Sequence, residues 1–180
     1  AESVVNVQIV REEAQRRVSL ASFSGLVLPG DGDFIISCCG DSIALLESEQ
    51  NHLEVIFEDL WCGKGRLLKK DDRTGICLIR CRSNKKTPRG NFLQTSREHE
   101  LFIPRKTNVL TVANPFGIEH SVRYGVVNDL SLCVGRSCSS TFKLQLPAVP
   151  GEGGGVVCDF SGKFIGLISP LPGIASTRGI

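Results

Sequence analysis

The sequence predicts an all-β protein in which two six-stranded antiparallel β-barrels pack together. Three observations lead to this prediction. Short runs rich in β-branched residues recur along the chain, 19 Gly and 8 Pro supply many turns between them, and one polar stretch divides the runs into two sets. With 180 residues and 41% hydrophobic content, the chain is long enough to bury a core and too apolar to be disordered. One long β-sandwich is the alternative architecture.

Residues 1–84 are predicted to form the first barrel. Its strands are expected at six runs, 4–10, 23–28, 34–39, 53–57, 65–68 and 76–81. Two segments between these runs, 12–17 and 41–49, are predicted as short helices, the second with Ile43, Leu45 and Leu46 facing inward. The polar stretch at 85–100, which holds Pro88 and Gly90, is expected to link the two halves.

The second barrel is predicted from residues 101–180. Its strands are expected at 109–112, 121–127, 141–146, 156–160 and 164–168. The longest charge-free stretch near the end of the chain covers 164–177, and Pro170 and Pro172 interrupt it. Because a membrane-spanning helix needs about 20 consecutive apolar residues, no membrane span is predicted.

The net charge of +2 conceals an uneven distribution. Residues 62–106 hold 13 Lys and Arg against 4 Asp and Glu, whereas residues 1–61 hold 3 against 11. Runs of charge are usually solvated surfaces. The alternative is that residues 62–106 bind an acidic protein or a nucleic acid. Few aromatic residues lie among these charges to stack on bases, so nucleic acid is a possible but less favoured partner.

Eight cysteines are placed unlike a disulfide framework. Cys38 and Cys39 are adjacent and would point to opposite faces of a strand, and Cys77 lies in an apolar run where a free thiol packs as a small hydrophobe. Cys133 and Cys138 are the best candidates for a disulfide. No Cys-x-x-Cys motif exists and the three histidines are scattered, which predicts neither zinc nor another cofactor. This usage favours an intracellular reducing compartment.

Four segments carry motifs that follow one another in a fixed order. They are Ser-Val-Val-Asn-Val at 3–7, Ser-Gly-Leu-Val-Leu at 24–28 before Asp-Gly at 31–32, Asn-Pro-Phe-Gly at 114–117 before Tyr-Gly-Val-Val at 124–127, and Gly-Glu-Gly-Gly-Gly-Val-Val at 151–157 before Gly-Lys-Phe-Ile-Gly-Leu at 162–167. Together they resemble the HtrA (Do-like, DegP-like) family of chymotrypsin-fold serine proteases over nearly the whole chain. The resemblance implies a single trypsin-like protease domain made of both barrels, with no PDZ domain after Ile180.

Acyl transfer by such an enzyme needs a serine nucleophile, a histidine base and an aspartate that orients the histidine. By resemblance, the histidine would stand at Gly40, the aspartate at Gly75 and the serine at Gly153. All three positions are glycine, which can neither attack a carbonyl carbon nor accept a proton. The resemblance therefore implies a pseudoprotease that binds a protein or peptide as a scaffolding or regulatory module, and it implies a homo-oligomer.

Parts of the binding apparatus need no side chain. The backbone N–H groups of Gly151 and Gly153 match the family's oxyanion hole and would form a small anion-binding nest, unless the glycines at 153–155 let the loop relax and close. Glu152 is expected to place a carboxylate beside this nest and to oppose anions. The family's substrate adds as a strand along a segment that matches Ile168 and Ser169, where the following proline weakens strand addition because it lacks an N–H donor.

A second functional hypothesis is an active peptidase whose catalytic residues have moved. It requires a cysteine nucleophile with a histidine close enough to stabilise the thiolate. The candidate residues are Cys38, Cys39, Cys158, His52 and His120.

Overall fold

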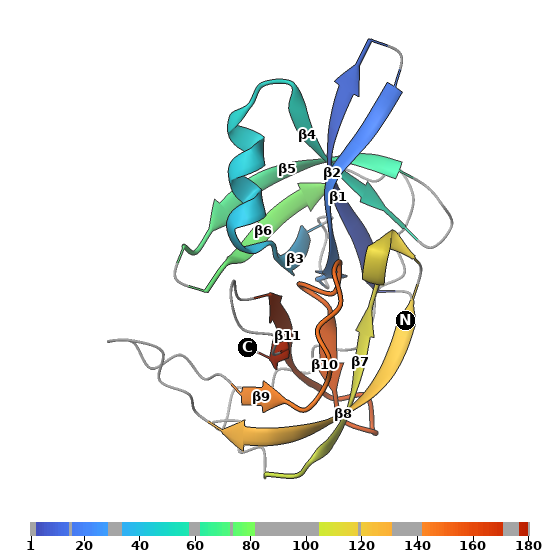
Figure 1. Cartoon of the computed structure of the whole chain (residues 1–180), viewed down its shortest axis with the longest axis vertical. Helices are drawn as coiled ribbons and strands as arrows, with labels where there is room; N and C mark the ends of the chain where they lie inside the picture. Colours follow the sequence, from blue (N-terminus) through green and yellow to red (C-terminus); the bar gives the residue numbers. More distant parts are fainter. Residues whose placement is uncertain are drawn as a thin grey trace.

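The computed structural model of the chain describes residues 3–14, 16–28, 34–57, 62–72, 74–81, 105–118, 120–130, 142–170 and 177–179. Two closed antiparallel barrels of six strands each pack together, the first above the second in Figure 1. The predicted two-barrel all-β architecture is therefore confirmed, and it is compatible with a chymotrypsin-like fold. No helix within these ranges is both long enough and apolar enough to span a bilayer.

The first barrel is built from the N-terminal strands. They are β1 (Val4–Glu13), β2 (Arg16–Val27), β3 (Phe34–Cys38), β4 (Asn51–Ile56), β5 (Cys62–Lys70) and β6 (Ile76–Cys81), and they close in the order β1-β2-β3-β6-β5-β4. Val5, Val7 and Ile9 alternate along β1 and are buried in the core, as a strand with one interior face requires. Ile35 and Ile79 meet them from β3 and β6.

The segment at 12–17 is not a helix. β1 continues to Glu13 and β2 begins at Arg16, so the two strands form a hairpin that projects from the barrel (Figure 1). Glu12 lies opposite Arg17, and Glu13 lies opposite Arg16. Cross-strand pairs of opposite charge stabilise a hairpin, and this pairing explains why a polar segment extends two strands instead of coiling.

The helix predicted at 41–49 exists as the 3₁₀ helix η1 (Gly40–Glu47). Ile43 is buried and Leu46 is half-buried, but Leu45 is 37% exposed, so the prediction that Leu45 faces inward is wrong. A 3₁₀ helix has three residues per turn, which aligns residues i and i+3 on one edge. Ile43 and Leu46 share that edge and Leu45 lies off it.

The second barrel follows the same plan. Its elements are β7 (Asn108–Ala113), the short 3₁₀ turn η2 (Pro115–Gly117), β8 (Ser121–Leu130), β9 (Phe142–Leu144), β10 (Val156–Cys158), β11 (Phe164–Pro170) and β12 (Thr177–Gly179), with the strand order β10-β11-β12-β9-β8-β7. Strand β12 has no counterpart among the predicted runs. The predicted linker at 85–100 and the candidate disulfide Cys133–Cys138 lie outside the described residues.

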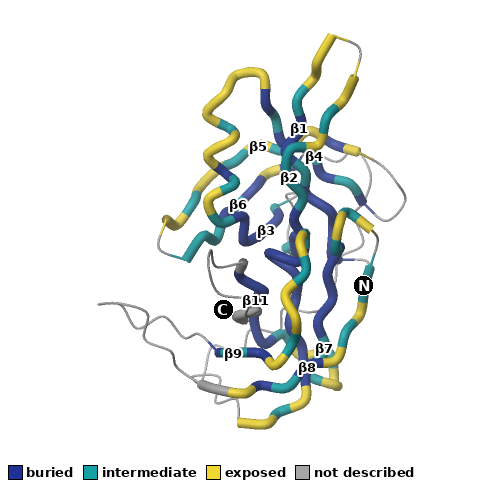
Figure 2. The backbone as a smooth tube through the Cα atoms, in the orientation of Figure 1, coloured by how far each residue is buried: buried dark blue, intermediate teal, exposed yellow. Residues whose placement is uncertain are grey.

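The two barrels share a buried junction, seen in Figure 2 as buried backbone that continues from one barrel into the other. Val4 and Leu26 of the first barrel form one apolar cluster with Val112, Val156 and Leu167 of the second. Burying this surface removes apolar area from water for both barrels at once. The two barrels therefore share part of their buried apolar surface.

Gly154 marks the closest approach between the barrels. A Cβ atom at this position would lie 2.1 Å from the Ser24 carbonyl oxygen, 2.5 Å from Ser37 Oγ and 2.7 Å from the Cys38 nitrogen. Its φ of +81° also lies in the left-handed region that favours glycine. Only a residue without a side chain permits this contact.

We expect Gly154→Ala to lower the free energy of unfolding by about 3 kcal/mol or more, because the methyl group would overlap backbone that cannot move independently. Gly162→Ala is the matched control. Gly162 has nearly the same φ, +83°, but no atom within 4 Å of its Cβ position, so it isolates the left-handed penalty of about 1–2 kcal/mol. Urea unfolding measures both, and equal losses would contradict the junction contact.

Candidate functional site

The structure brings into contact two of the three glycines that the sequence predicted at catalytic positions. Gly40 follows β3, and Gly75 precedes β6. Because β3 and β6 pair antiparallel, with Cys38 opposite Ile76, the end of one strand meets the start of the other. The Cys39 N–H donates to the Gly75 carbonyl oxygen at 3.2 Å, and a Cβ atom on Gly75 would lie 3.3 Å from Gly40 Cα.

Gly153 comes to the same region from the second barrel. Its carbonyl oxygen accepts a hydrogen bond from the Ser24 N–H at 2.7 Å. The next residue, Gly154, packs on the backbone of Cys38, two residues before Gly40. Ser169 reaches the region from β11, with its Oγ 3.5 Å from Cys38 Sγ. Gly154 and Ser169 of the second barrel therefore both contact Cys38, the last residue of β3.

Backbone conformation distinguishes the three glycines. Gly40 has a φ of +54° and Gly75 a φ of +73°, a region where residues with a side chain are strained. Gly153 is not among the residues with positive φ. The turns at Gly40 and Gly75 thus favour glycine for a structural reason, whereas the conformation of Gly153 is open to any residue.

Cys38 is the reactive side chain nearest to Gly40 and Gly75. Its sulfur lies 3.5 Å from the Thr74 carbonyl oxygen and 3.5 Å from Ser169 Oγ. Burial raises the pKa of the Cys38 thiol, and the hydrogen bond with Ser169 offsets this only in part. A buried thiol that stays protonated at neutral pH is a poor nucleophile.

The loop at 151–155 is held by its carbonyl groups. The Gly151 oxygen accepts a hydrogen bond from Ser24 Oγ at 2.9 Å, and the Gly153 oxygen accepts one from the Ser24 N–H. Within the described ranges, neither the Gly151 N–H nor the Gly153 N–H donates to a protein acceptor. Backbone N–H groups with no protein acceptor can donate to an anion or to a polarised carbonyl oxygen.

Part of the loop does close onto β11. The Gly154 N–H donates to the Ile168 carbonyl oxygen at 2.7 Å, and the Ile168 N–H donates to the Gly155 carbonyl oxygen at 2.8 Å. On its other side β11 pairs with β12, Ile168 lying opposite Gly179. Ser169 and Pro170 continue the pairing with β12, opposite Arg178 and Thr177. A peptide could not add as a strand along Ile168 and Ser169 without displacing these partners.

Glu152 does not face the nest, contrary to the sequence prediction. Its side chain is 2% exposed and forms an ion pair with Arg123 of β8. Its other carboxylate oxygen accepts a hydrogen bond from the Val149 N–H at 3.1 Å, and Arg123 also donates to the Pro147 carbonyl oxygen at 2.9 Å. The negative charge is compensated by Arg123. The sequence signal was a single arginine within the apolar run at 121–127.

Ser24 organises the site and was not singled out by sequence reasoning. It is fully buried, and besides its bonds to Gly151 and Gly153 its Oγ accepts a hydrogen bond from the Asn114 N–H at 2.8 Å. Its carbonyl oxygen accepts one from Ser37 Oγ at 2.6 Å. A buried serine inside an apolar run has no local signature, because its partners are distant in sequence.

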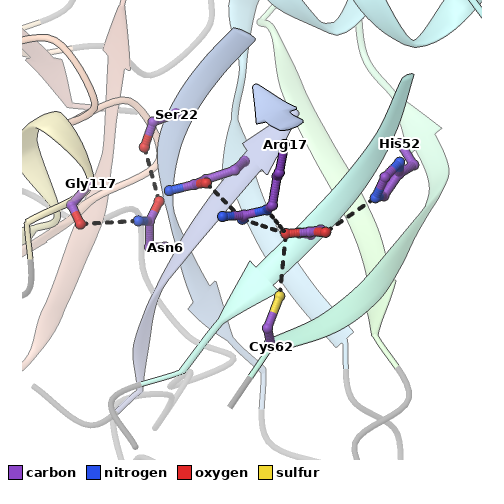
Figure 3. A network of polar contacts seen from close by, with 8 residues as sticks. Asn6, Arg17, Ser22, His52, Cys62 and Gly117 are labelled. Carbon is purple, nitrogen blue, oxygen red and sulfur yellow. Dashed lines mark hydrogen bonds and ion pairs between the residues drawn. The ribbon is translucent and has the colours of Figure 1, made fainter. Parts of the chain in front are cut away.

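The histidines considered for a relocated active site have other partners. Figure 3 shows His52 on the outer face of the first barrel, where its Nε2 lies 3.1 Å from a carboxylate oxygen of Glu54. Cys62 donates to the same carboxylate at 3.4 Å. Burial and this carboxylate raise the pKa of the Cys62 thiol, which opposes the thiolate that catalysis needs. His120 contacts the Val4 carbonyl oxygen at 2.9 Å.

The same view shows how the polar face of β1 contacts both barrels. Arg17 forms an ion pair with Glu54, while Asn6 donates to the Gly117 carbonyl oxygen of the second barrel at 3.2 Å and accepts a hydrogen bond from Ser22 at 2.9 Å (Figure 3). Partial burial raises the pKa of Glu54, but the hydrogen bonds from Arg17, His52 and Cys62 outweigh it, so the net direction is downward. These contacts join strands to one another and connect the two barrels, so a structural role accounts for this network.

No protein-family model matches the chain, and no curated protein matches it. Among the described residues there is also no group of three or more His, Cys, Asp or Glu side chains that could hold a metal ion. The site must therefore be interpreted from its own geometry.

We expect Ser24→Ala to lower the free energy of unfolding by about 1–3 kcal/mol, because it leaves the Asn114 N–H and the Gly151 oxygen buried without their partner. Ser22→Ala, on the same strand but half-buried, is the control and should cost less. Chemical denaturation gives both values. A smaller loss at Ser24 than at Ser22 would contradict its role.

Proposed function

We propose that this chain is a catalytically inactive, HtrA-like protease homologue that binds protein or peptide segments at the junction of its barrels. The observation that supports this best is the contact between Gly40 and Gly75, the positions that would hold the base and its orienting acid, with Gly154, the residue after the position of the nucleophile, packed on Cys38. In this proposal the chain has the backbone segments that would position a catalytic site but lacks the catalytic side chains.

Chemistry argues for binding over turnover. Without a nucleophile and a base, the remaining backbone groups would supply a rate enhancement of roughly 10³–10⁴ over uncatalysed hydrolysis, too little for a peptide bond. The N–H groups of Gly151 and Gly153 would instead donate hydrogen bonds to a carbonyl or carboxylate oxygen of a bound segment. A peptide that added as a strand along Ile168 and Ser169 would have to displace β12. We also propose that the chain forms a homo-oligomer.

The proposal predicts that the chain does not cleave proteins. We expect no new termini after overnight incubation with a carboxymethylated, unfolded protein, read by mass spectrometry. Cleavage that disappears in Cys62→Ser, Cys38→Ala or His52→Ala would contradict the proposal and establish a relocated active site. Cleavage that is equal in all variants identifies a contaminating protease, which further purification removes before the assay is scored.

The backbone conformation at the three glycines also predicts how much stability is lost when the catalytic side chains are restored. Gly153→Ser should fold with little change in stability, whereas Gly40→His and Gly75→Asp should each cost about 1–3 kcal/mol because both positions have positive φ. Thermal unfolding measures these losses. A triple variant that folds well and cleaves the unfolded protein would support descent from a protease, whereas equal losses at all three positions would contradict the conformational argument.

A second candidate function has one specific observation in its favour. Arg66 of β5 and Arg80 of β6 lie directly opposite each other, both exposed, and like charges in such a pair destabilise a sheet. Arg80 also lies over the Phe34 ring, 5.8 Å from its centroid. With exposed Lys69 nearby on β5, this face suits an acidic protein or a phosphate backbone.

An anion bound to this face would release counterions, so its affinity would fall steeply with salt. If the basic face is the functional surface, Arg66→Gln should weaken binding to a single-stranded oligonucleotide or an acidic peptide and reduce the salt dependence. Lys163→Gln, an exposed cation on the second barrel, should leave binding unchanged. Fluorescence anisotropy at several salt concentrations measures both, and equal effects would mean non-specific attraction.

A further inference from the structure

Two buried cysteines meet inside the first barrel. Cys39 follows β3, and Cys77 lies in β6 opposite Ser37. Their sulfur atoms are 2.7 Å apart, and the side chains are in the barrel core, with Cys39 2% and Cys77 1% exposed. The backbones are fixed against each other by the bond from the Cys39 N–H to the Gly75 carbonyl oxygen.

We propose that Cys39 and Cys77 are a redox-active dithiol, which a small peroxide oxidises to a disulfide that links β3 to β6. A disulfide bond is about 2.05 Å long, so the two sulfurs need to approach by only a fraction of an ångström. Both thiols are free in the structure. The inference does not depend on whether the junction binds a peptide.

The reaction has two steps. The Cys77 thiolate attacks one peroxide oxygen, the O–O bond breaks, and the other oxygen leaves as hydroxide, which is protonated to water; Cys77 becomes a sulfenic acid. Cys39 then attacks the Cys77 sulfur, the S–O bond breaks, and a second water leaves with the Cys39 proton. Two thiols lose two electrons, and one peroxide is reduced to two waters. A thiol reductant reverses the link by exchange.

The surroundings favour Cys77 as the attacking sulfur. The hydrogen bond with Cys39 lowers the pKa of the Cys77 thiol and outweighs the opposing effect of burial, and Ser37 and Lys70 act in the same direction as the hydrogen bond. The pKa of Cys39 is raised, because its hydrogen bond with Cys77 and its burial both disfavour the thiolate. One thiol is therefore stabilised as the nucleophile while its neighbour keeps the proton that the second step releases.

Other described cysteines are less suited to this chemistry. Cys38 points the opposite way along β3, toward Ser169 in the junction. Cys62 is exposed beside Glu54, and Cys158 lies in the junction cluster. The pKa of each of these three thiols is raised, chiefly by burial.

The link would have a structural consequence. It would close a loop between positions 38 residues apart, which restricts the unfolded chain and stabilises the fold. It would also tie together the two strands that carry Gly40 and Gly75. Because both sulfurs are buried, the oxidant would reach them through local opening of the barrel, more slowly than a reagent alkylates exposed Cys62.

The test uses the full chain, reduced and then treated with hydrogen peroxide. Catalase stops the reaction, N-ethylmaleimide in denaturant blocks the remaining thiols, and peptides are mapped by mass spectrometry. We expect a Cys39–Cys77 linked peptide and a rise in Tm that dithiothreitol reverses. Alkylation of both cysteines after peroxide treatment, or a link between other cysteines with none between these two, would overturn the proposal.

Variants separate this pair from other thiols. Cys39→Ala should lose both the linked peptide and the reversible rise in Tm, whereas Cys38→Ala, the adjacent buried cysteine that faces the junction, should keep both. A rise in Tm that persists in Cys39→Ala would overturn the proposal. Should the alanine variants not fold, the linked peptide in the unaltered chain decides the question by itself.

Discussion

The hydrogen bonds of Ser24 with the loop at 151–155 are the interaction on which the rest of the structure depends. One buried residue of the first barrel binds two carbonyl oxygens of the second, Gly151 and Gly153, and accepts a bond from the Asn114 N–H. These bonds need the loop to lie directly on β2, which the missing side chain of Gly154 permits. The apolar cluster around Leu26 then closes the junction.

That contact also determines what the site can do. Because Ser24 binds the loop through carbonyl groups, the N–H groups of Gly151 and Gly153 remain available, while Gly154 and Gly155 fasten the loop to Ile168. Arg123 neutralises the one carboxylate in the loop, that of Glu152. In the proposed function, these two N–H groups hold a bound segment.

Sequence reasoning predicted the architecture because alternating apolar runs such as the one in β1 report burial directly. The assignment of Gly40, Gly75 and Gly153 to catalytic positions stays a prediction. Sequence reasoning failed at residues 12–17, where the deciding factor was cross-strand charge pairing between Glu12 and Arg17, and at Leu45, where a 3₁₀ turn replaced the α-helical period.

The details of the site were beyond the reach of sequence because they depend on long-range contacts. Nothing adjacent to Ser24 predicts a partner at Gly151, and nothing adjacent to Glu152 predicts Arg123. The Cys39–Cys77 contact likewise arises from the pairing of β3 with β6 and from which side of β3 each cysteine occupies. Strand propensity predicts the strands, whereas register and face determine which side chains meet.

The most direct test of binding at the junction is residue-resolved amide hydrogen exchange, with and without a saturating amount of the carboxymethylated, unfolded protein. Binding through these donors predicts slower exchange at the Gly151 and Gly153 amides and no change in the hairpin of β1 and β2. Unchanged exchange at these two amides, or protection confined to β5 and β6, would contradict a binding site at the barrel junction.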